Sequence, residues 1–174
     1  MLIFIIGYMG SGKTTFGKRL ANKLGYRFID LDDLMISETG YSISDFFKEF
    51  GEDLFRKKER ECLLNFFIDT TKDIVIATGG GTPCYADNMD VMNEHGVTVF
   101  LDTPLEIILE RINKDMTGRP LLKDIPAEER SKFIKEHLEK RRRYYSLAQI
   151  RVQGDKMNEE EVCKIITKNL RLKT

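Results

Sequence analysis

The chain has 174 residues, 41% of them hydrophobic, which suits one compact domain with a core of ordinary size. Its 28 Lys and Arg residues match its 28 Asp and Glu residues, and this balance argues against a general binder of nucleic acid or membrane surfaces. The cysteines form no CxxC pair, so neither a zinc site nor a disulfide framework is indicated, and we expect reduced thiols in a cytoplasmic protein.

Short apolar runs alternate with longer helix-like segments, with no internal repeat and no linker that would split the chain. This alternation is typical of βαβ units with buried parallel strands. We therefore expect a single domain over residues 1–174, an α/β fold with three α/β/α layers and a five-stranded parallel sheet. The first predicted strand, 2–6, is too short for a signal peptide or a membrane span, which indicates a soluble protein.

The segment that follows, GYMGSGKT (7–14), matches the phosphate-loop pattern GxxxxGK followed by Ser or Thr at every fixed position. A buried strand leads into it and a helix with an apolar face leads out, as the pattern requires. Glycines let the backbone wrap around a phosphate with its N–H groups inward, and the helix N-terminus adds positive charge. We expect Lys13 to reach the β- and γ-phosphates and Thr14 to bind Mg²⁺. The nucleotide-binding set is Gly10, Ser11, Gly12, Lys13, Thr14 and Thr15.

A cluster of aspartates follows the weaker second strand, 27–29. If the chain stays extended, Asp30 and Asp32 lie on the same side, where one could serve a metal and the other could meet a hydroxyl. Asp32 or Asp33 would also suit the N-cap of the next helix. The pattern alone leaves both interpretations open.

A helix is predicted over 52–70, and the third strand, 74–77, runs into three consecutive glycines, Gly79, Gly80 and Gly81. A flexible turn would need only one glycine. Three of them at the carboxyl end of a buried strand favour a ligand lying against bare backbone. Arg56, in the predicted helix, is a candidate anion ligand, although it could simply pair with Glu52.

The strand 97–101 is followed by a helix start in which Thr103 is the expected N-cap, with Pro104 and Glu106 completing the signal. The apolar stripe of this helix is Leu105, Ile108, Leu109 and Ile112. The polar stretch 113–124 then predicts a mobile lid loop that contains Arg119.

The last part of the chain predicts a helix over 127–146, with Arg141 near its end, and a weaker strand over 149–152. A final helix is expected to start at Asn158. Its core-facing residues are expected to be Val162, Ile165, Ile166 and Leu170.

Six segments resemble the shikimate kinase family in order and spacing: GYMGSGKT, IDLDDLM, GEDLFRKKE, ATGGGTP, TGRPLL and EKRRRYY. The resemblance runs from Leu2 to about Val152. A large superfamily shares the first segment, whereas the ordered set is far more specific. It implies a P-loop kinase fold and a monomeric enzyme of the chorismate pathway that phosphorylates the 3-hydroxyl of shikimate with ATP and Mg²⁺.

The resemblance implies that Asp32 holds hydroxyls of shikimate and that Arg56 and Arg141 bind its carboxylate, with Gly80 in contact. Guanidinium groups suit this task because they bind carboxylates bidentately. For the nucleotide, it implies that Arg119 reaches the phosphates and that Arg111 lies near the adenine. Asp30 would help to organise Mg²⁺ through water.

Other P-loop proteins are the alternatives. Gluconate kinase and a nucleoside-monophosphate kinase share the expected fold, but three glycines and two arginines favour shikimate. A GTPase-like switch would need NKxD after a strand. Here the similar segment, 113–116, ends in Met116 and follows a helix.

Overall fold

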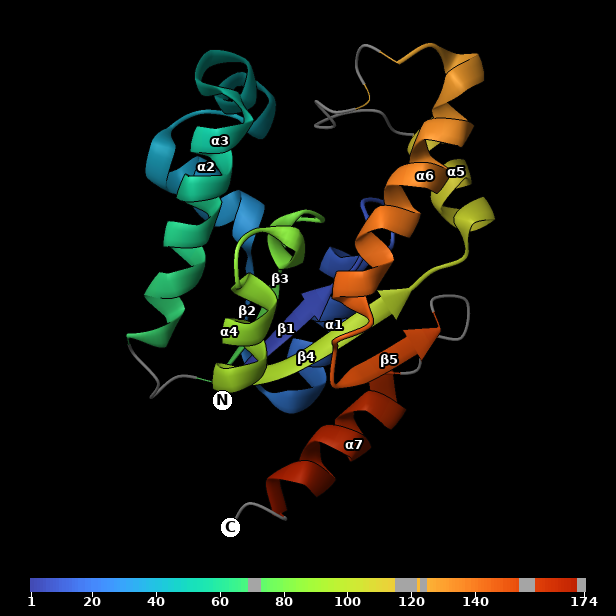
Figure 1. Cartoon of the computed structure of the whole chain (residues 1–174). Coiled ribbons are helices and arrows are strands. Elements are labelled where there is room, and N and C mark those ends of the chain that lie inside the picture. The colour runs from blue at the N-terminus through green and yellow to red at the C-terminus, as the bar shows by residue number, and fades with distance from the viewer. Residues whose placement is uncertain (69–72, 115–121, 123–124, 154–158, 172–174) are drawn as a thin grey trace.

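The structure is a computed structural model that describes residues 1–68, 73–114, 122, 125–153 and 159–171. Its strands form one five-stranded sheet of order β2-β3-β1-β4-β5 (Figure 1). All neighbouring strands are parallel. The predicted sheet is therefore confirmed, including its two weaker strands. The strands are β1 (Leu2–Ile6), β2 (Arg27–Asp30), β3 (Ile74–Ala77), β4 (Gly96–Asp102) and β5 (Ile150–Gln153).

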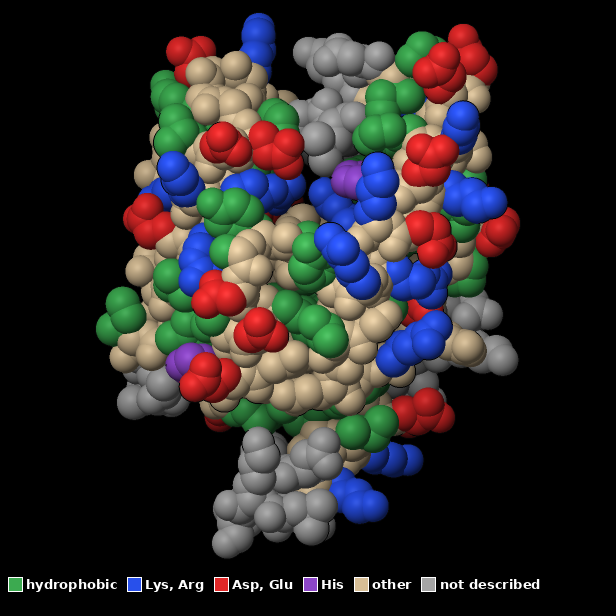
Figure 2. Space-filling view, in the orientation of Figure 1, with side chains coloured by type: hydrophobic (Ala, Val, Ile, Leu, Met, Phe, Trp, Pro, Cys, Tyr) green, Lys and Arg blue, Asp and Glu red, His purple; other side chains and the backbone are tan. Residues whose placement is uncertain are grey.

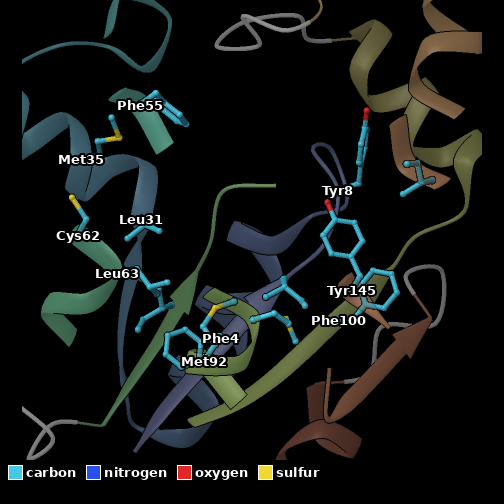
Figure 3. Packing of buried hydrophobic residues seen from close by; sticks show 14 of the residues in the cluster. Phe4, Tyr8, Leu31, Met35, Phe55, Cys62, Leu63, Met92, Phe100 and Tyr145 are labelled. Carbon is cyan, nitrogen blue, oxygen red and sulfur yellow. The ribbon is translucent and has the colours of Figure 1, made fainter. Parts of the chain in front are cut away.

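Helices cover both faces of the sheet, which confirms the predicted three layers. Side chains alternate along β1, so Ile3 and Ile5 pack into one core cluster while Leu2, Phe4 and Ile6 pack into the other. The first cluster lies under α1 (Lys13–Leu24) and α7 (Glu159–Arg171). The second, part of which Figure 3 shows, lies under the remaining helices: α2 (Leu31–Thr39), α3 (Ile43–Leu64), α4 (Asn88–His95), α5 (Leu105–Lys114) and α6 (Ala127–Tyr145).

The carboxyl ends of the central strands meet at one edge of the sheet. Ile5 of β1 pairs with Ala77, the last residue of β3, and with Val99 of β4, which continues to Asp102. The chain leaves β1 for β2 and β3 on one side and later adds β4 and β5 on the other, so the strand order reverses at β1. In open α/β sheets, ligands bind at such a reversal.

Helix α3 differs from the predicted helix 52–70. It begins at Ile43 and is broken at Gly51, where φ is 76° and ψ is 173°, a conformation that glycine adopts readily and other residues do not. The prediction therefore found only the second segment, and a 3₁₀ turn, η1 (Asn65–Phe67), ends it early. The first segment has a signal that was missed, because the Ser42 hydroxyl accepts a hydrogen bond from the Asp45 amide as an N-cap.

The last helix, α7, begins at Glu159 and confirms the inward position of Val162 and Ile166. The prediction for Ile165 is wrong, because this residue is 43% exposed. Val162 and Ile166 pack into the core cluster that α1 covers, and Ile165 lies at the rim of that stripe. Asn158 and the side chain of Leu170 lie outside the described residues. Among the helices described, none has the length and hydrophobicity needed to cross a bilayer.

Candidate active site

The phosphate loop connects β1 to α1, and its glycines Gly7, Gly10 and Gly12 all have positive φ. The loop closes on itself, because the Ser11 amide donates to the Tyr8 carbonyl at 3.1 Å. Lys13 Nζ donates to the carbonyls of Gly7 and Tyr8, both at 3.0 Å. The lysine ammonium therefore lies over the loop that the sequence predicts to bind phosphate.

Two residues of the β4–α5 region support this loop. Thr103, the expected N-cap, lies two residues before the start of α5 at Leu105 and donates its hydroxyl to the Ser11 carbonyl at 3.0 Å. Arg111 Nη1 donates to the Gly10 carbonyl at 3.1 Å. Arg111 thus lies beside the phosphate loop.

The aspartate cluster has a different geometry from the extended one that its spacing suggested. β2 ends at Asp30 and α2 begins at once, so Asp32 lies in the first turn of a helix, and the two carboxylates do not share one side of an extended strand as predicted. Asp30, rather than Asp32 or Asp33, is the N-cap, because its Oδ1 accepts from the Asp32 amide at 3.1 Å. Its other oxygen accepts from the Thr14 hydroxyl at 2.7 Å. The two predicted metal ligands, Thr14 and Asp30, are therefore in contact.

Protein side chains occupy part of the space beside the three glycines. A Cβ at Gly79 would clash with Glu59 Oε1, and a Cβ at Gly81 would clash with the guanidinium of Arg56. The expectation of bare backbone is therefore wrong for these two positions. At Gly80, a Cβ would lie 3.2 Å from the Met9 amide of the phosphate loop, so the glycine run packs directly against that loop.

Arg56 and Arg141, the two predicted carboxylate ligands, meet at this glycine run. Arg56 is 9% exposed and Arg141 is 8% exposed. The Arg56 guanidinium lies against Gly81, and Arg141 Nη1 lies 3.4 Å from the position of a Cβ on Gly80. Adjacent glycines therefore bring together two arginines from helices far apart in the sequence, α3 and α6.

Glu59 is a further residue of the candidate site, which the sequence alone did not indicate. It is 1% exposed, and its carboxylate accepts from Arg56 Nη1 at 2.7 Å and from the Thr82 hydroxyl at 2.6 Å. The alternative partner considered for Arg56, Glu52, is also present at 3.5 Å, but it is mostly exposed. The spacing of three residues between Arg56 and Glu59 on a helix is the signal that could have found this pair.

Helix α6 is attached to the same loops by two tyrosine contacts. Tyr145, fully buried, donates its hydroxyl to the Gly80 carbonyl at 2.6 Å. Tyr8 of the phosphate loop lies with its hydroxyl 3.0 Å from His137 Nδ1. These contacts, which no pattern in the sequence indicated, hold the helix that carries Arg141 against both the glycine run and the phosphate loop.

The charged groups of the site alter each other's protonation. Burial lowers the pKa of Lys13 to about 8, while Asp32 and Asp30 act in the opposite direction. Burial raises the pKa of Asp32 to about 7, and the negative charges of Glu59 and Asp30 add to this effect. The structure thus combines a lysine, a carboxyl group that titrates near neutrality and two arginines at one edge of the sheet.

Figure 2 shows this edge as a hollow between the α2–α3 lobe and α6, with Lys and Arg side chains on its walls. Arg119 and most of the predicted lid lie outside the described residues. Asn113 and Lys114 are the last residues of α5 and do not follow a strand, which further separates them from a guanine-binding NKxD segment.

Comparisons with known proteins agree with this geometry. The family model described as shikimate kinase matches residues 9–171. A shikimate kinase from Persephonella marina is 44% identical over 153 residues, covering 88% of each chain. One from Phocaeicola vulgatus is 40% identical over 171 residues, covering 98% of this chain and 97% of the relative.

Solved structures give the same result. Shikimate kinase from Bacteroides thetaiotaomicron matches with a TM-score of 0.86 and 36% identity over 98% of both chains. The Acinetobacter baumannii enzyme in complex with shikimate matches with a TM-score of 0.85 and 32% identity, covering 97% of this chain and 93% of that one. A gluconokinase from Sinorhizobium meliloti, at 18% identity and a TM-score of 0.56, shares the fold alone. This chain belongs to the shikimate kinase family.

Proposed function

We propose that this chain transfers the γ-phosphoryl group of ATP to the 3-hydroxyl of shikimate, giving ADP and shikimate 3-phosphate. The observation that carries the proposal is a pair of buried arginines next to the phosphate loop, Arg56 and Arg141. Their guanidinium groups lie against the adjacent glycines Gly81 and Gly80. A small hydroxy acid needs a carboxylate clamp at a distance from the hydroxyl that reacts, and two guanidinium groups provide one. A nucleotide acceptor would have no carboxylate to place there.

On the nucleotide side, residues 10–15 bind the phosphates through backbone N–H groups and Lys13. Thr14 and Asp30 supply hard oxygen donors in contact with each other, which fits Mg²⁺ held by few protein ligands together with phosphates and water. Bound Mg²⁺ would neutralise charge on the phosphates. Arg111 lies beside the loop, where it would flank the adenine.

On the acceptor side, Asp32 orients the attacking hydroxyl and accepts its proton late in the transfer. A pKa near 7 suits this task, because the carboxylate is then partly ionised at neutral pH and still basic. Arg56 and Arg141 hold the carboxylate, and Gly80, which lies beside Arg141, contacts the acceptor. Positioning and charge neutralisation account for most of the catalysis of phosphoryl transfer.

The lid that follows α5, up to about residue 124, would close over the bound substrates and bring Arg119 to the phosphates. Closure would exclude water and so limit hydrolysis of ATP. Lys13 and Arg119 would then stabilise the oxygens of the transferring group together with Mg²⁺.

The test is a coupled ADP-release assay with shikimate, gluconate and nucleoside monophosphates as separate acceptors. We expect turnover with shikimate only. Lys13→Ala is the control and should abolish nearly all turnover, because solvent cannot replace a phosphate clamp in a closed site. Preferential use of another acceptor would contradict the proposal, and so would turnover by Lys13→Ala within about threefold of the unmodified enzyme.

A further inference from the structure

Tyr8 makes a contact that the phosphate-binding role of its loop does not need. Its side chain is 1% exposed, and its hydroxyl lies 3.0 Å from Nδ1 of His137 on α6. The two rings meet edge to face, with centroids 5.6 Å apart and an interplanar angle of 82°. The His137 ring also packs against the ring of Phe133, one helical turn earlier, with the ring centroids 5.3 Å apart. Both partners are therefore held in place by packing.

The same tyrosine touches both halves of the active site. Its backbone carbonyl accepts from Lys13 Nζ at 3.0 Å, on the nucleotide side. Its ring lies 5.8 Å from the guanidinium carbon of Arg141, on the acceptor side. His137 and Arg141 are four residues apart on α6 and thus on one face of the helix. The hydroxyl of Tyr8 therefore holds the helical turn that leads to Arg141.

The protonation states define the direction of this hydrogen bond. Burial lowers the pKa of His137 to about 4, and the positive charges of Arg141, Lys140 and Arg56 act in the same direction. The ring is then neutral at pH 7 and has one nitrogen that can accept. Burial raises the pKa of Tyr8 to about 12, so its hydroxyl keeps its proton and donates to Nδ1.

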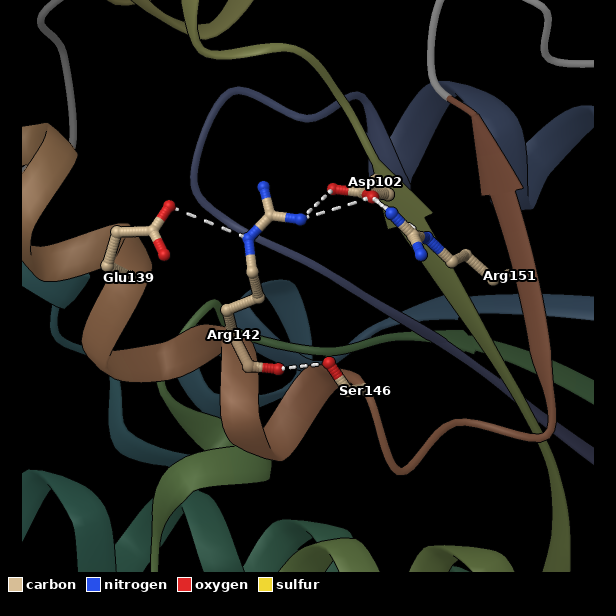
Figure 4. A network of polar contacts seen from close by, with 5 residues as sticks. All are labelled: Asp102, Glu139, Arg142, Ser146 and Arg151. Atoms are coloured by element: carbon tan, nitrogen blue, oxygen red, sulfur yellow. Dashed lines mark hydrogen bonds and ion pairs between the residues drawn. The ribbon is translucent and has the colours of Figure 1, made fainter.

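Other contacts keep α6 in place when this bond is absent. At the end of the helix, Tyr145 donates its hydroxyl to the Gly80 carbonyl. Figure 4 shows a second contact there, in which Arg142 Nη1 pairs with Asp102 at 3.4 Å. Loss of the Tyr8–His137 bond should therefore leave the helix folded on the sheet. Without this bond, the Tyr8 hydroxyl no longer connects the phosphate loop to the helical turn that carries Arg141.

We propose that Tyr8 and His137 are positioning residues whose hydrogen bond sets Arg141 relative to the phosphate loop, and so sets the acceptor carboxylate relative to the transferring phosphate. This inference rests on the proposed function. The competing explanation is that Tyr8 and His137 only fill the core beneath the site.

The experiment compares Tyr8→Phe, His137→Leu, His137→Asn and the double variant Tyr8→Phe/His137→Leu by steady-state kinetics. Tyr8→Phe and His137→Leu should each raise the KM for shikimate about tenfold and leave the KM for ATP within about twofold. His137→Asn, whose carbonyl oxygen can accept near the position of Nδ1, should stay within about threefold of the unmodified enzyme. The double variant should be no worse than either single one, because both remove the same bond.

A KM for shikimate within about twofold of the unmodified value in both Tyr8→Phe and His137→Leu would overturn the inference. It would also be overturned if His137→Asn were as impaired as His137→Leu, since ring packing would then be the cause. An equal rise in both KM values would indicate general damage to the phosphate loop and would likewise contradict it. If the unmodified enzyme did not phosphorylate shikimate, the proposed function would fail first, and this inference with it.

Discussion

Glu59 holds the guanidinium of Arg56 in place, with a hydrogen bond of 2.7 Å between two side chains that are both buried. The pair lies on one helix, α3, and its carboxylate also accepts from Thr82 beside the glycine run. Arg56 is thus oriented before any acceptor arrives. A buried carboxylate that receives two hydrogen bonds is costly to alter, which makes the pair a sensitive point of the site.

We therefore expect Glu59→Gln to raise the KM for shikimate about tenfold with little change in the KM for ATP, because the hydrogen bonds of Arg56 lose their ionic component. The matched control is Glu61→Gln on the same helix, since Glu61 is 62% exposed and pairs with Lys58 at the surface. Its kinetics should stay within about twofold of the unmodified enzyme, as surface pairs contribute little. If both variants changed the KM for shikimate equally, Glu59 would have no specific role in acceptor binding.

The pH dependence of kcat/KM for shikimate follows from Asp32 and Lys13. Asp32 has a raised pKa of about 7 and acts when ionised, so activity should fall as the pH drops below that value. Lys13 has a lowered pKa of about 8 and acts when charged, so activity should fall again as the pH rises above it. The two groups interact, so the profile belongs to the pair, with its maximum between the two values.

Two variants separate the limbs of this profile. Asp32→Asn should lose the acid limb in its residual activity, and Lys13→Arg should lose the alkaline limb because arginine stays charged. Glu59→Gln should move the acid limb to lower pH, since the charge of Glu59 is one cause of the raised pKa of Asp32. An acid limb that stays unchanged in Asp32→Asn would show that another group controls it.

The segments of the candidate site that the sequence located are those in which one short segment carries the signal. The phosphate loop, the glycine run and the two arginines each lie within a recognisable segment, and the strands around them are continuous apolar runs. The geometry of Asp30 and Asp32 was mispredicted because it depends on where β2 ends and α2 begins. A shift of one residue changes which face a side chain occupies.

The contacts that were missed are those between distant segments. Glu59 reaches Thr82, Tyr145 reaches Gly80, and Tyr8 reaches His137, a separation of 129 residues. In one sequence such pairs have no periodic signal, because packing of α3 and α6 onto the sheet creates them. The reason for glycine at Gly79 and Gly81 is of the same kind, since side chains from a distant helix need the space.

Gly79→Ala tests this steric explanation. The added methyl group would clash with the Glu59 carboxylate, which is tied to Arg56 and cannot move freely. We expect a loss of stability of about 1–3 kcal/mol, typical of overpacking, and weaker binding of shikimate with unchanged binding of an ATP analogue. Gly80→Ala is the comparison, because its nearest neighbour is less close, at 3.2 Å. Thermal unfolding and calorimetric titration measure the two effects, and a Gly79→Ala protein as stable as the unmodified one would contradict the explanation.

The assignment of the acceptor depends most directly on Arg56 and Arg141. Truncating either arginine to alanine leaves the carboxylate of the acceptor with half its clamp in a pocket whose charged partners are buried. Losing one hydrogen-bonded charge in such a place costs roughly 2–5 kcal/mol. The Kd for shikimate should therefore rise about thirtyfold or more, while the affinity for a non-hydrolysable ATP analogue should barely change.

Calorimetric titration of each variant with both ligands distinguishes the possible outcomes. Lys57→Ala and Arg143→Ala are matched controls, because each removes an exposed cation from the same helix as its partner in the test and should leave both affinities within about twofold. Arg56→Lys should fail to restore shikimate binding, since an ammonium group cannot reproduce the planar fork that a carboxylate accepts. Equal losses for both ligands would indicate a folding defect or a nucleotide role for these arginines. Unchanged shikimate binding in both alanine variants would mean that other residues hold the carboxylate, and the acceptor assignment would then have to be abandoned.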